Sequence, residues 1–183
     1  RDGRVRTFVG IDVTEESRQR ARESQETLRE APGRLAIVEP ENLHLTLKFL
    51  GEVDQAQIEP IIGALRAVRA DPFNLTVGYA VCNHPQRPRV IWCDVTDSGK
   101  SAALARQVDD LLEPLGFPRE KRPFRPHVTL ARVKDLHPAL TKEVERRIPR
   151  EPLGRCLVSA VKLKKSTLTP GGPIYEDLAA VTL

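Results

Sequence analysis

Apolar residues recur along this chain with two periods, which predicts both helices and strands. Spacings of three and four residues indicate amphipathic helices around residues 58–68, 104–115 and 136–148. Apolar or alternating runs predict strands at residues 5–11, 35–38, 43–50, 73–81, 89–95, 127–133, 155–164 and 174–183. A charged helix is expected after Thr14, an N-cap residue with Glu15 and Glu16 in the first turn. Because strands and helices are mixed rather than strictly alternating, an α+β protein with largely antiparallel sheets is favoured.

Glycine and proline mark where several of these elements begin and end. Gly51 is expected to close the strand at residues 43–50, and Pro60 suits the first turn of the helix that follows. Gly116 suits the C′ position after the helix at residues 104–115. Residues 117–126 are expected to form a loop rich in proline and arginine. No linker or low-complexity segment interrupts the chain, so residues 1–183 are expected to form a single domain.

One four-residue pattern occurs twice, as His44-Leu45-Thr46-Leu47 and as His127-Val128-Thr129-Leu130. Side chains alternate faces along a strand, so each histidine projects beside its threonine while the apolar neighbours point into a core. The two copies lie about half the chain length apart, and each is followed by an amphipathic helix and then two strands. This coarse duplication predicts two lobes related by a pseudo-two-fold axis, with the two motifs facing each other across a cleft.

The paired motifs carry the residue types that phosphodiester cleavage requires. A histidine with a pKa near 6.5 serves as general base or general acid near neutral pH, and two histidines supply both. Two threonine hydroxyls can donate hydrogen bonds to the phosphoryl oxygens as their charge develops. A single His-x-Thr is more often an ordinary polar strand face, but two copies at matching places favour a functional site. No carboxylate cluster accompanies the motifs, so neither a metal nor another cofactor is expected.

Composition narrows the class of protein further. The chain has 183 residues, of which 40% are hydrophobic and 30% charged, as in an ordinary globular protein. Its net charge of +4 suits a polyanionic partner but does not demand one. No apolar run approaches the roughly 18 residues that span a membrane. The first residues lack the apolar segment of a signal peptide. Three cysteines without Cys-x-x-Cys spacing favour a reducing compartment, so a cytoplasmic protein is expected. A zinc site is not expected at Cys82, His84 and Cys93, because these residues lack paired zinc-ligand spacing.

Basic and aromatic residues surround the motifs and are candidates for binding a nucleic acid. The basic candidates include Arg119, Lys121, Arg122 and Arg125 before the second motif, Lys48 and Lys134 in the motif strands, and Arg132. The aromatic candidates for stacking on a base are Phe49, Phe124 and Tyr175. Arg132 follows Thr129 by three residues, which puts it on the opposite face of an ideal strand unless a bulge intervenes.

On these residues the chain resembles the two-histidine (2H) phosphoesterases, specifically the RNA 2′,3′-cyclic phosphodiesterase branch, also called 2′-5′ RNA ligases. The resemblance runs from near Arg6 to the C-terminus. Its most specific parts are the segments at residues 40–51 (Pro-Glu-Asn-Leu-His-Leu-Thr-Leu-Lys-Phe-Leu-Gly) and 122–132 (Arg-Pro-Phe-Arg-Pro-His-Val-Thr-Leu-Ala-Arg). Shorter matching segments lie at residues 88–92 and 172–175. His84 departs from the pattern, because relatives tend to carry an apolar or aromatic residue there.

The resemblance implies a bilobal fold in which two antiparallel sheets line a central cleft and helices pack outside. It implies metal-independent opening of an RNA 2′,3′-cyclic phosphate to a 2′-phosphate, and a weak, ATP-independent reverse reaction that joins ends through a 2′-5′ linkage. His44 would be the proton donor and His127 the proton acceptor, whereas the near-symmetry of the motifs alone does not orient the pair. Arg132 would belong to the phosphate site, in conflict with the alternation argument.

Two other functions remain open on the sequence alone. The same chemistry would suit small cyclic phosphates or 2′-5′-linked oligoadenylates. A non-catalytic module that binds RNA ends is the alternative of another class, although two intact His-Thr motifs argue against it. The expected partner is RNA with a 2′,3′-cyclic phosphate end, with no membrane, and the chain is expected to be a monomer.

Overall fold

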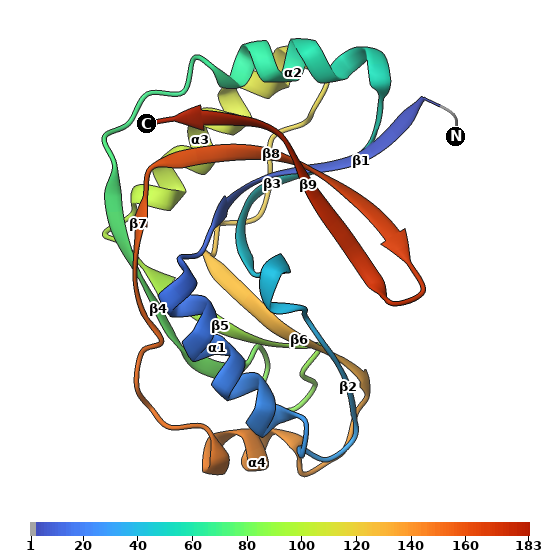
Figure 1. Ribbon diagram of the computed structural model, residues 1–183, viewed down its shortest axis with the longest axis vertical. Helices are drawn as coiled ribbons and strands as arrows, with labels where there is room; N and C mark the ends of the chain where they lie inside the picture. The colour runs from blue at the N-terminus through green and yellow to red at the C-terminus, as the bar shows by residue number, and fades with distance from the viewer. Residues whose placement is uncertain (1–2) are drawn as a thin grey trace.

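Nine strands form one strongly curled antiparallel sheet in the computed structural model, which describes residues 3–183 (Figure 1). The hydrogen-bonded order is β7-β4-β5-β6-β3-β1-β8-β9, and β2 pairs with the free stretch of β6. The strands are β1 (Arg4–Asp12), β2 (Arg34–Ile37), β3 (His44–Asp54), β4 (Phe73–Cys82), β5 (Val90–Thr96), β6 (His127–Asp135), β7 (Gly154–Val158), β8 (Ala160–Thr169) and β9 (Gly172–Thr182). The α+β class predicted from the sequence is confirmed.

The expected two sheets are joined edge to edge, which corrects that part of the prediction. The two motif strands, β3 and β6, pair at one position only, Leu45 opposite Val128. Both side chains are buried in the common core, and beyond them the strands diverge as the sheet twists. We call the part with β1, β3, β8 and β9 the His44 lobe, and the part with β2, β4, β5, β6 and β7 the His127 lobe.

Four helices cover the outer faces of the two lobes (Figure 1). They are α1 (Glu15–Leu28), α2 (Ile58–Leu65), α3 (Lys100–Leu112) and α4 (Leu140–Arg147). Helix α3 packs on β3 with α2 beside it, whereas α1 and α4 pack on the His127 lobe. Thr14 caps α1, because its hydroxyl accepts the Ser17 N–H at 3.4 Å, and Gly116 follows α3 and a short 3₁₀ turn at positive φ, as expected.

Three of the differences from the predicted element boundaries have a clear structural cause. Strand β3 continues through Gly51 to Asp54, because Gly51 at φ +79° still pairs with Thr7 of β1. The segment at residues 155–164 divides into β7 and β8, since β7 pairs with β4 in one lobe and β8 with β1 in the other. Helix α4 begins only at Leu140, just after Pro138.

The buried apolar residues of both lobes form one continuous cluster. The three cysteines are free thiols. Among residues 3–183 no helix is long and apolar enough to cross a membrane. Within the same range, no three His, Cys, Asp or Glu side chains gather as a metal site would require.

Candidate active site

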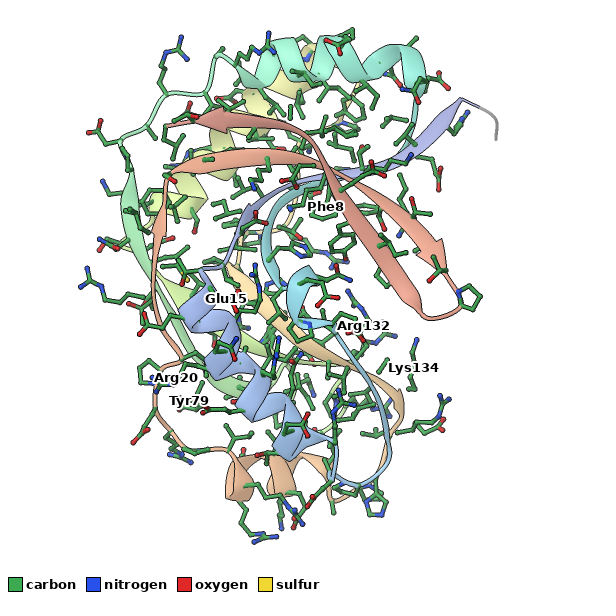
Figure 2. All side chains as sticks on the ribbon, viewed as in Figure 1. Phe8, Glu15, Arg20, Tyr79, Arg132 and Lys134 are labelled. Carbon is green, nitrogen blue, oxygen red and sulfur yellow. The ribbon has the colours of Figure 1, made fainter. Side chains whose placement is uncertain are left out.

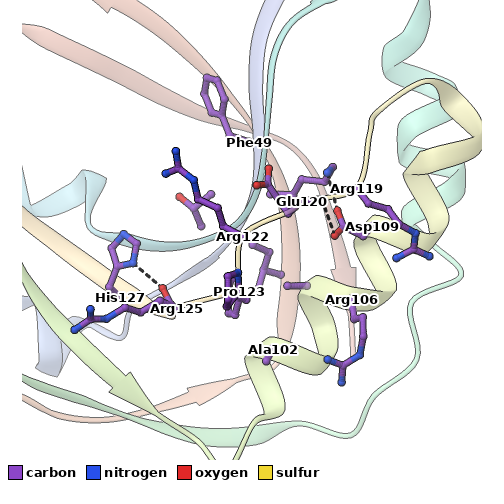
Figure 3. A pocket seen from close by; sticks show the side chains of 15 residues that line it. Phe49, Ala102, Arg106, Asp109, Arg119, Glu120, Arg122, Pro123, Arg125 and His127 are labelled. Atoms are coloured by element: carbon purple, nitrogen blue, oxygen red, sulfur yellow. Dashed lines mark hydrogen bonds and ion pairs between the residues drawn. The ribbon is translucent and has the colours of Figure 1, made fainter.

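The two motif histidines begin adjacent strands and are oriented in the same way. The Nδ1–H of His44 donates to the Asn42 carbonyl at 2.7 Å. The Nδ1–H of His127 donates to the Arg125 carbonyl at 2.8 Å, a bond that Figure 3 shows as a dashed line. In both cases the acceptor lies two residues before the histidine. Because a carbonyl can only accept, Nδ1 carries the proton in each neutral ring. Both Nε2 atoms are therefore left to accept or donate a proton in the cleft.

The motif threonines lie on the same strand face as their histidines. The Thr46 hydroxyl is 2.8 Å from Nε2 of His44, where it donates to the neutral ring. Thr129 occupies the equivalent place in β6, half-buried and opposite Trp92 of β5. Each lobe therefore presents an imidazole and a hydroxyl together, as the alternation along the strands predicts.

Aromatic side chains support each imidazole, and two of them, Phe8 and Trp92, had no role in the sequence analysis. The ring of Phe8 lies 4.6 Å from that of His44, and Tyr175 meets His44 edge-on at 5.4 Å. In the other lobe Trp92 lies 4.2 Å from His127, and the Arg125 guanidinium covers the indole at 4.8 Å. These contacts hold the rings in place and shield them from water.

A bulge in each motif strand decides which side chains share the histidine face. Thr129 pairs with Trp92 and Ala131 with Ile91, so Leu130 is the extra residue and lies buried beside Ala131. Arg132 is thereby returned to the face of His127, which overturns the argument from ideal alternation and agrees with the family resemblance.

The same break in register occurs in β3. Thr46 pairs with Gly10 and Lys48 with Val9, so Leu47 is the extra residue. Phe49, which is 50% exposed, therefore occupies in the His44 lobe the position that Arg132 occupies in the other. One lobe presents an apolar ring at this point and the other a guanidinium.

Lys48 is not available as the substrate ligand that the sequence predicted. The extra residue in β3 turns Lys48 toward α3, and the side chain is only 4% exposed. Its ammonium lies 2.6 Å from Asp109 Oδ1 and donates to the Pro118 carbonyl at 2.7 Å. Lys48 therefore joins β3 to α3 and to the loop that follows.

Each histidine is paired with an aspartate on the neighbouring strand. Asp12 of β1 pairs with His44, and Asp94 of β5 pairs with His127. Cations hold both carboxylates: Lys162 and Lys164 contact Asp12 at 2.7 and 2.9 Å, and Arg125 contacts Asp94 at 3.2 Å. The sequence did contain a signal for these residues, because Asp-Val-Thr occurs at residues 12–14 and again at residues 94–96.

The surroundings lower the pKa of both histidines. Burial is the largest cause of the lowered pKa of His44, and the Lys164 ammonium adds to it, whereas the Asn42 carbonyl and Asp12 oppose it. Burial is also the largest cause for His127, and the guanidiniums of Arg125 and Arg132 add to it, while Asp94 opposes it. Neutral imidazoles are therefore favoured in the free protein.

A cavity of about 490 Å³ opens beside His127 and Thr46, whereas His44 and Thr129 do not line it (Figure 3). It lies between β3, α3 and the loop at residues 117–126, and it begins at Thr46 and His127. Phe49, Phe124, Arg122 and Arg125 also line it, whereas Tyr175 and Arg132 do not. The loop rich in proline and arginine thus forms one wall of the site.

The remaining two histidines lie outside this site. The ring of His84 accepts the backbone N–H groups of Gln86 and Arg87 in its own loop. The ring of His137 accepts the N–H of Ala139 before α4. Both side chains have local structural roles.

The fold and the paired motifs define a two-histidine phosphoesterase. The LigT-like phosphoesterase family model matches residues 11–92 and 96–175, and the chain belongs to this family. It is 39% identical over 175 residues to the RNA 2′,3′-cyclic phosphodiesterase of Archaeoglobus fulgidus, covering 95% of this chain and 98% of that protein. The protein of the same name from Thermotoga maritima is 38% identical over 177 residues, covering 95% and 93%.

Solved structures show the same fold. TT0787 of Thermus thermophilus superposes with a TM-score of 0.81 at 31% identity, covering 97% of both chains. The apo form of Escherichia coli LigT superposes with a TM-score of 0.78 at 28% identity, covering 99% of this chain and 98% of LigT.

Proposed function

We propose that this protein is an RNA 2′,3′-cyclic phosphodiesterase that opens the cyclic phosphate to a 2′-phosphate without a metal ion. The observation that carries the proposal is the pair of imidazoles, each anchored through Nδ1 to its own backbone, which leaves Nε2 of each ring for proton transfer. An acid and a base on opposite sides of a phosphorus suit in-line displacement. The names of the relatives support RNA as the substrate.

His127 acts as the proton acceptor and His44 as the proton donor in this proposal. This orientation follows the family resemblance, and burial together with the two guanidiniums near His127 favours the neutral form that a general base requires. His127 removes a proton from the attacking water, and His44 protonates the departing 3′-oxygen. Thr46, Thr129 and Arg132 donate to the non-bridging phosphoryl oxygens, whose charge must be stabilised in the transition state. With the 5′-hydroxyl of a second RNA in place of water, the same displacement, in which His44 protonates the departing 3′-oxygen, would join two RNA ends through a 2′-5′ linkage without ATP.

Three further side chains are proposed to contact the RNA, namely Phe49, Tyr175 and Arg125. Because both histidines come from one chain, a single copy supplies a complete pair, which supports a monomer. The site also takes residues from both lobes, which supports residues 1–183 as one functional unit. The three free thiols are in keeping with action in the cytoplasm.

The test uses a short RNA ending in a 2′,3′-cyclic phosphate, incubated with the protein in excess EDTA. We expect the wild type to yield a 2′-phosphate, and His44→Ala or His127→Ala to slow turnover by about a thousandfold, as loss of a general acid or base does. His84→Ala and His137→Ala are the matched controls and should retain activity.

Several outcomes would contradict the proposal. Full activity in both motif variants would show that the histidines are not catalytic. Loss of activity in EDTA would show that the reaction depends on a metal ion. Turnover of small cyclic phosphates or 2′-5′ oligoadenylates alone would change the substrate. Binding of the RNA end without turnover by the folded wild type would identify a binding module.

A further inference from the structure

The cavity beside His127 extends well beyond the two motifs. From Thr46 and His127 it continues past Phe49 and the loop to Ala102, Ala105 and Arg106 on α3. Figure 3 shows Arg122 extending from the loop toward the side of the cavity where Phe49 and His127 lie. The proposed opening of a cyclic phosphate assigns no role to the side chains that line this outer part.

The cations around the cavity fall into two groups. Lys48, Arg119 and Arg125 are each held by carboxylates of this chain, namely Asp109, Asp110 with Glu113, and Asp94. Arg106 and Arg122 line the same cavity, and neither forms an ion pair within residues 3–183.

One carboxylate, Glu120, lines the wall beside these two guanidiniums and likewise forms no ion pair in the described chain. The outer cavity therefore carries two cations and one anion that no side chain neutralises. An exposed phenyl ring, Phe49, and the partly buried Phe124 lie on the same walls.

The charged and aromatic side chains of the outer cavity suit a nucleotide, which has both a phosphate and a base, better than a small anion. A mononucleoside 2′,3′-cyclic phosphate carries its single negative charge at the histidines, so it leaves Arg122 and Arg106 without an acceptor. An RNA end supplies a second charge, the phosphodiester that links the terminal nucleotide to the one before it. Arginine is well suited to phosphate recognition, and aromatic rings stack on bases of any sequence.

We infer that the outer cavity binds the nucleotide on the 5′ side of the terminal one, with Arg122 contacting the internucleotide phosphate and Arg106 lying farther along. The inference rests on the proposed function and names its substrate class: RNA ends of at least two nucleotides. Arg122 is then a residue that selects RNA ends over mononucleotides, and Glu120 weakens that selection by repelling the phosphate.

The experiment compares kcat/KM for adenosine 2′,3′-cyclic phosphate and for the dinucleotide ApA ending in the same cyclic phosphate. We expect the wild type to prefer the dinucleotide, and Arg122→Ala to reduce the ratio of the two values by about tenfold, as loss of one hydrogen bond to a charged group does. Glu120→Gln should raise the ratio. Arg20→Ala, which changes an exposed arginine on α1 that does not line the cavity (Figure 2), should leave it unchanged.

An equilibrium measurement separates this inference from the proposed function. Binding of adenosine 2′-phosphate and of ApA 2′-phosphate is compared for the same four proteins, and it needs no turnover. A wild-type ratio near one, or a ratio that Arg122→Ala and Arg20→Ala leave equally unchanged, would overturn the subsite. Absence of turnover together with the expected binding ratios would overturn the proposed activity and leave the subsite supported.

Discussion

At the scale of single residues, each proposed catalytic histidine is influenced by a backbone carbonyl and by a carboxylate. A backbone carbonyl fixes the proton on Nδ1, and an aspartate lies across the sheet, with Asp12 opposite His44 and Asp94 opposite His127. Neither aspartate receives the Nδ1–H, and both are neutralised by lysine or arginine. The carboxylates therefore act on the histidines through space, by raising the histidine pKa against the effect of burial.

This arrangement predicts the pH dependence of the reaction. Catalysis needs His127 neutral and His44 protonated, so kcat/KM should fall below the pKa of His127 and above that of His44. Both pKa values are lowered from 6.5, so the maximum of kcat/KM should lie on the acid side of pH 6.5. Asp94→Asn removes a charge that raises the pKa of His127, and the acidic limb should move to lower pH.

The measurement is the pH profile of kcat/KM for the wild type and for Asp94→Asn. Asp135→Asn is the matched control, because Asp135 lies at the far end of β6 in an exposed pair with Arg34. An acidic limb that stays in place in Asp94→Asn, or that moves to higher pH, would contradict the electrostatic role of Asp94.

At the scale of elements, the site depends on a bulge in each motif strand and on one buried ion pair. These features determine which side chains face the histidines and where α3 lies. The bulges in β3 and β6 bring Phe49 and Arg132 onto the histidine face. The bulge in β3 also turns Lys48 toward α3, where Asp109 receives it. Because α3 forms a wall of the cavity, this ion pair connects the motif strand to the substrate side of the molecule.

Removing one member of this ion pair should destabilise the fold. Asp109→Ala leaves the Lys48 ammonium buried without its counter-charge, which costs about 3 kcal/mol. For a chain of this length that corresponds to a fall in Tm on the order of 10 °C. The measurement is thermal unfolding of Asp109→Ala, of Asp110→Ala and of the double variant Lys48→Met/Asp109→Leu.

The neighbouring Asp110 is the matched control. Its ion pair with Arg119 is exposed, so Asp110→Ala should change the free energy of unfolding by less than about 1 kcal/mol. The double variant replaces both charges by apolar groups and should recover most of the stability. Equal effects of Asp109→Ala and Asp110→Ala would show that the buried pair contributes little.

At the scale of the whole molecule, the two lobes are interleaved rather than sequential. The strands leave the His44 lobe after β1, return with β3, leave again with β4, and return between β7 and β8. The core is continuous across the β3–β6 junction. Such a chain is expected to unfold as one cooperative unit, because neither lobe retains a complete core alone.

Two spectroscopic probes test this cooperativity. The single tryptophan, Trp92, lies on β5 and reports on the His127 lobe, whereas far-UV circular dichroism averages over both lobes. Urea unfolding curves from the two probes should coincide. Transitions at separate urea concentrations would show that the lobes unfold independently and would contradict a single domain.

Much of the site was predictable because its signals are local. The His-x-Thr alternation, the N-cap at Thr14 and the helical spacing of Ile58 to Leu65 each depend on neighbours within a few residues. Periodicity therefore predicted most of the elements, the α+β class and the two candidate histidines. Phe8 and Asp94 were missed because their contacts with the histidines run between strands.

The sequence by itself determined which elements form and which chemistry each motif carries, since backbone geometry sets the periods of strands and helices. Only the tertiary structure decided how strands align. Pairing with β5 makes Leu130 an extra residue and thereby presents Arg132, and pairing with β4 and β1 divides one predicted strand near Ser159. Register depends on partners distant in the chain, and a shift of one residue exchanges the two faces of a strand. The same long-range packing pairs Lys48 with Asp109 and positions Arg122 in the wall of the cavity.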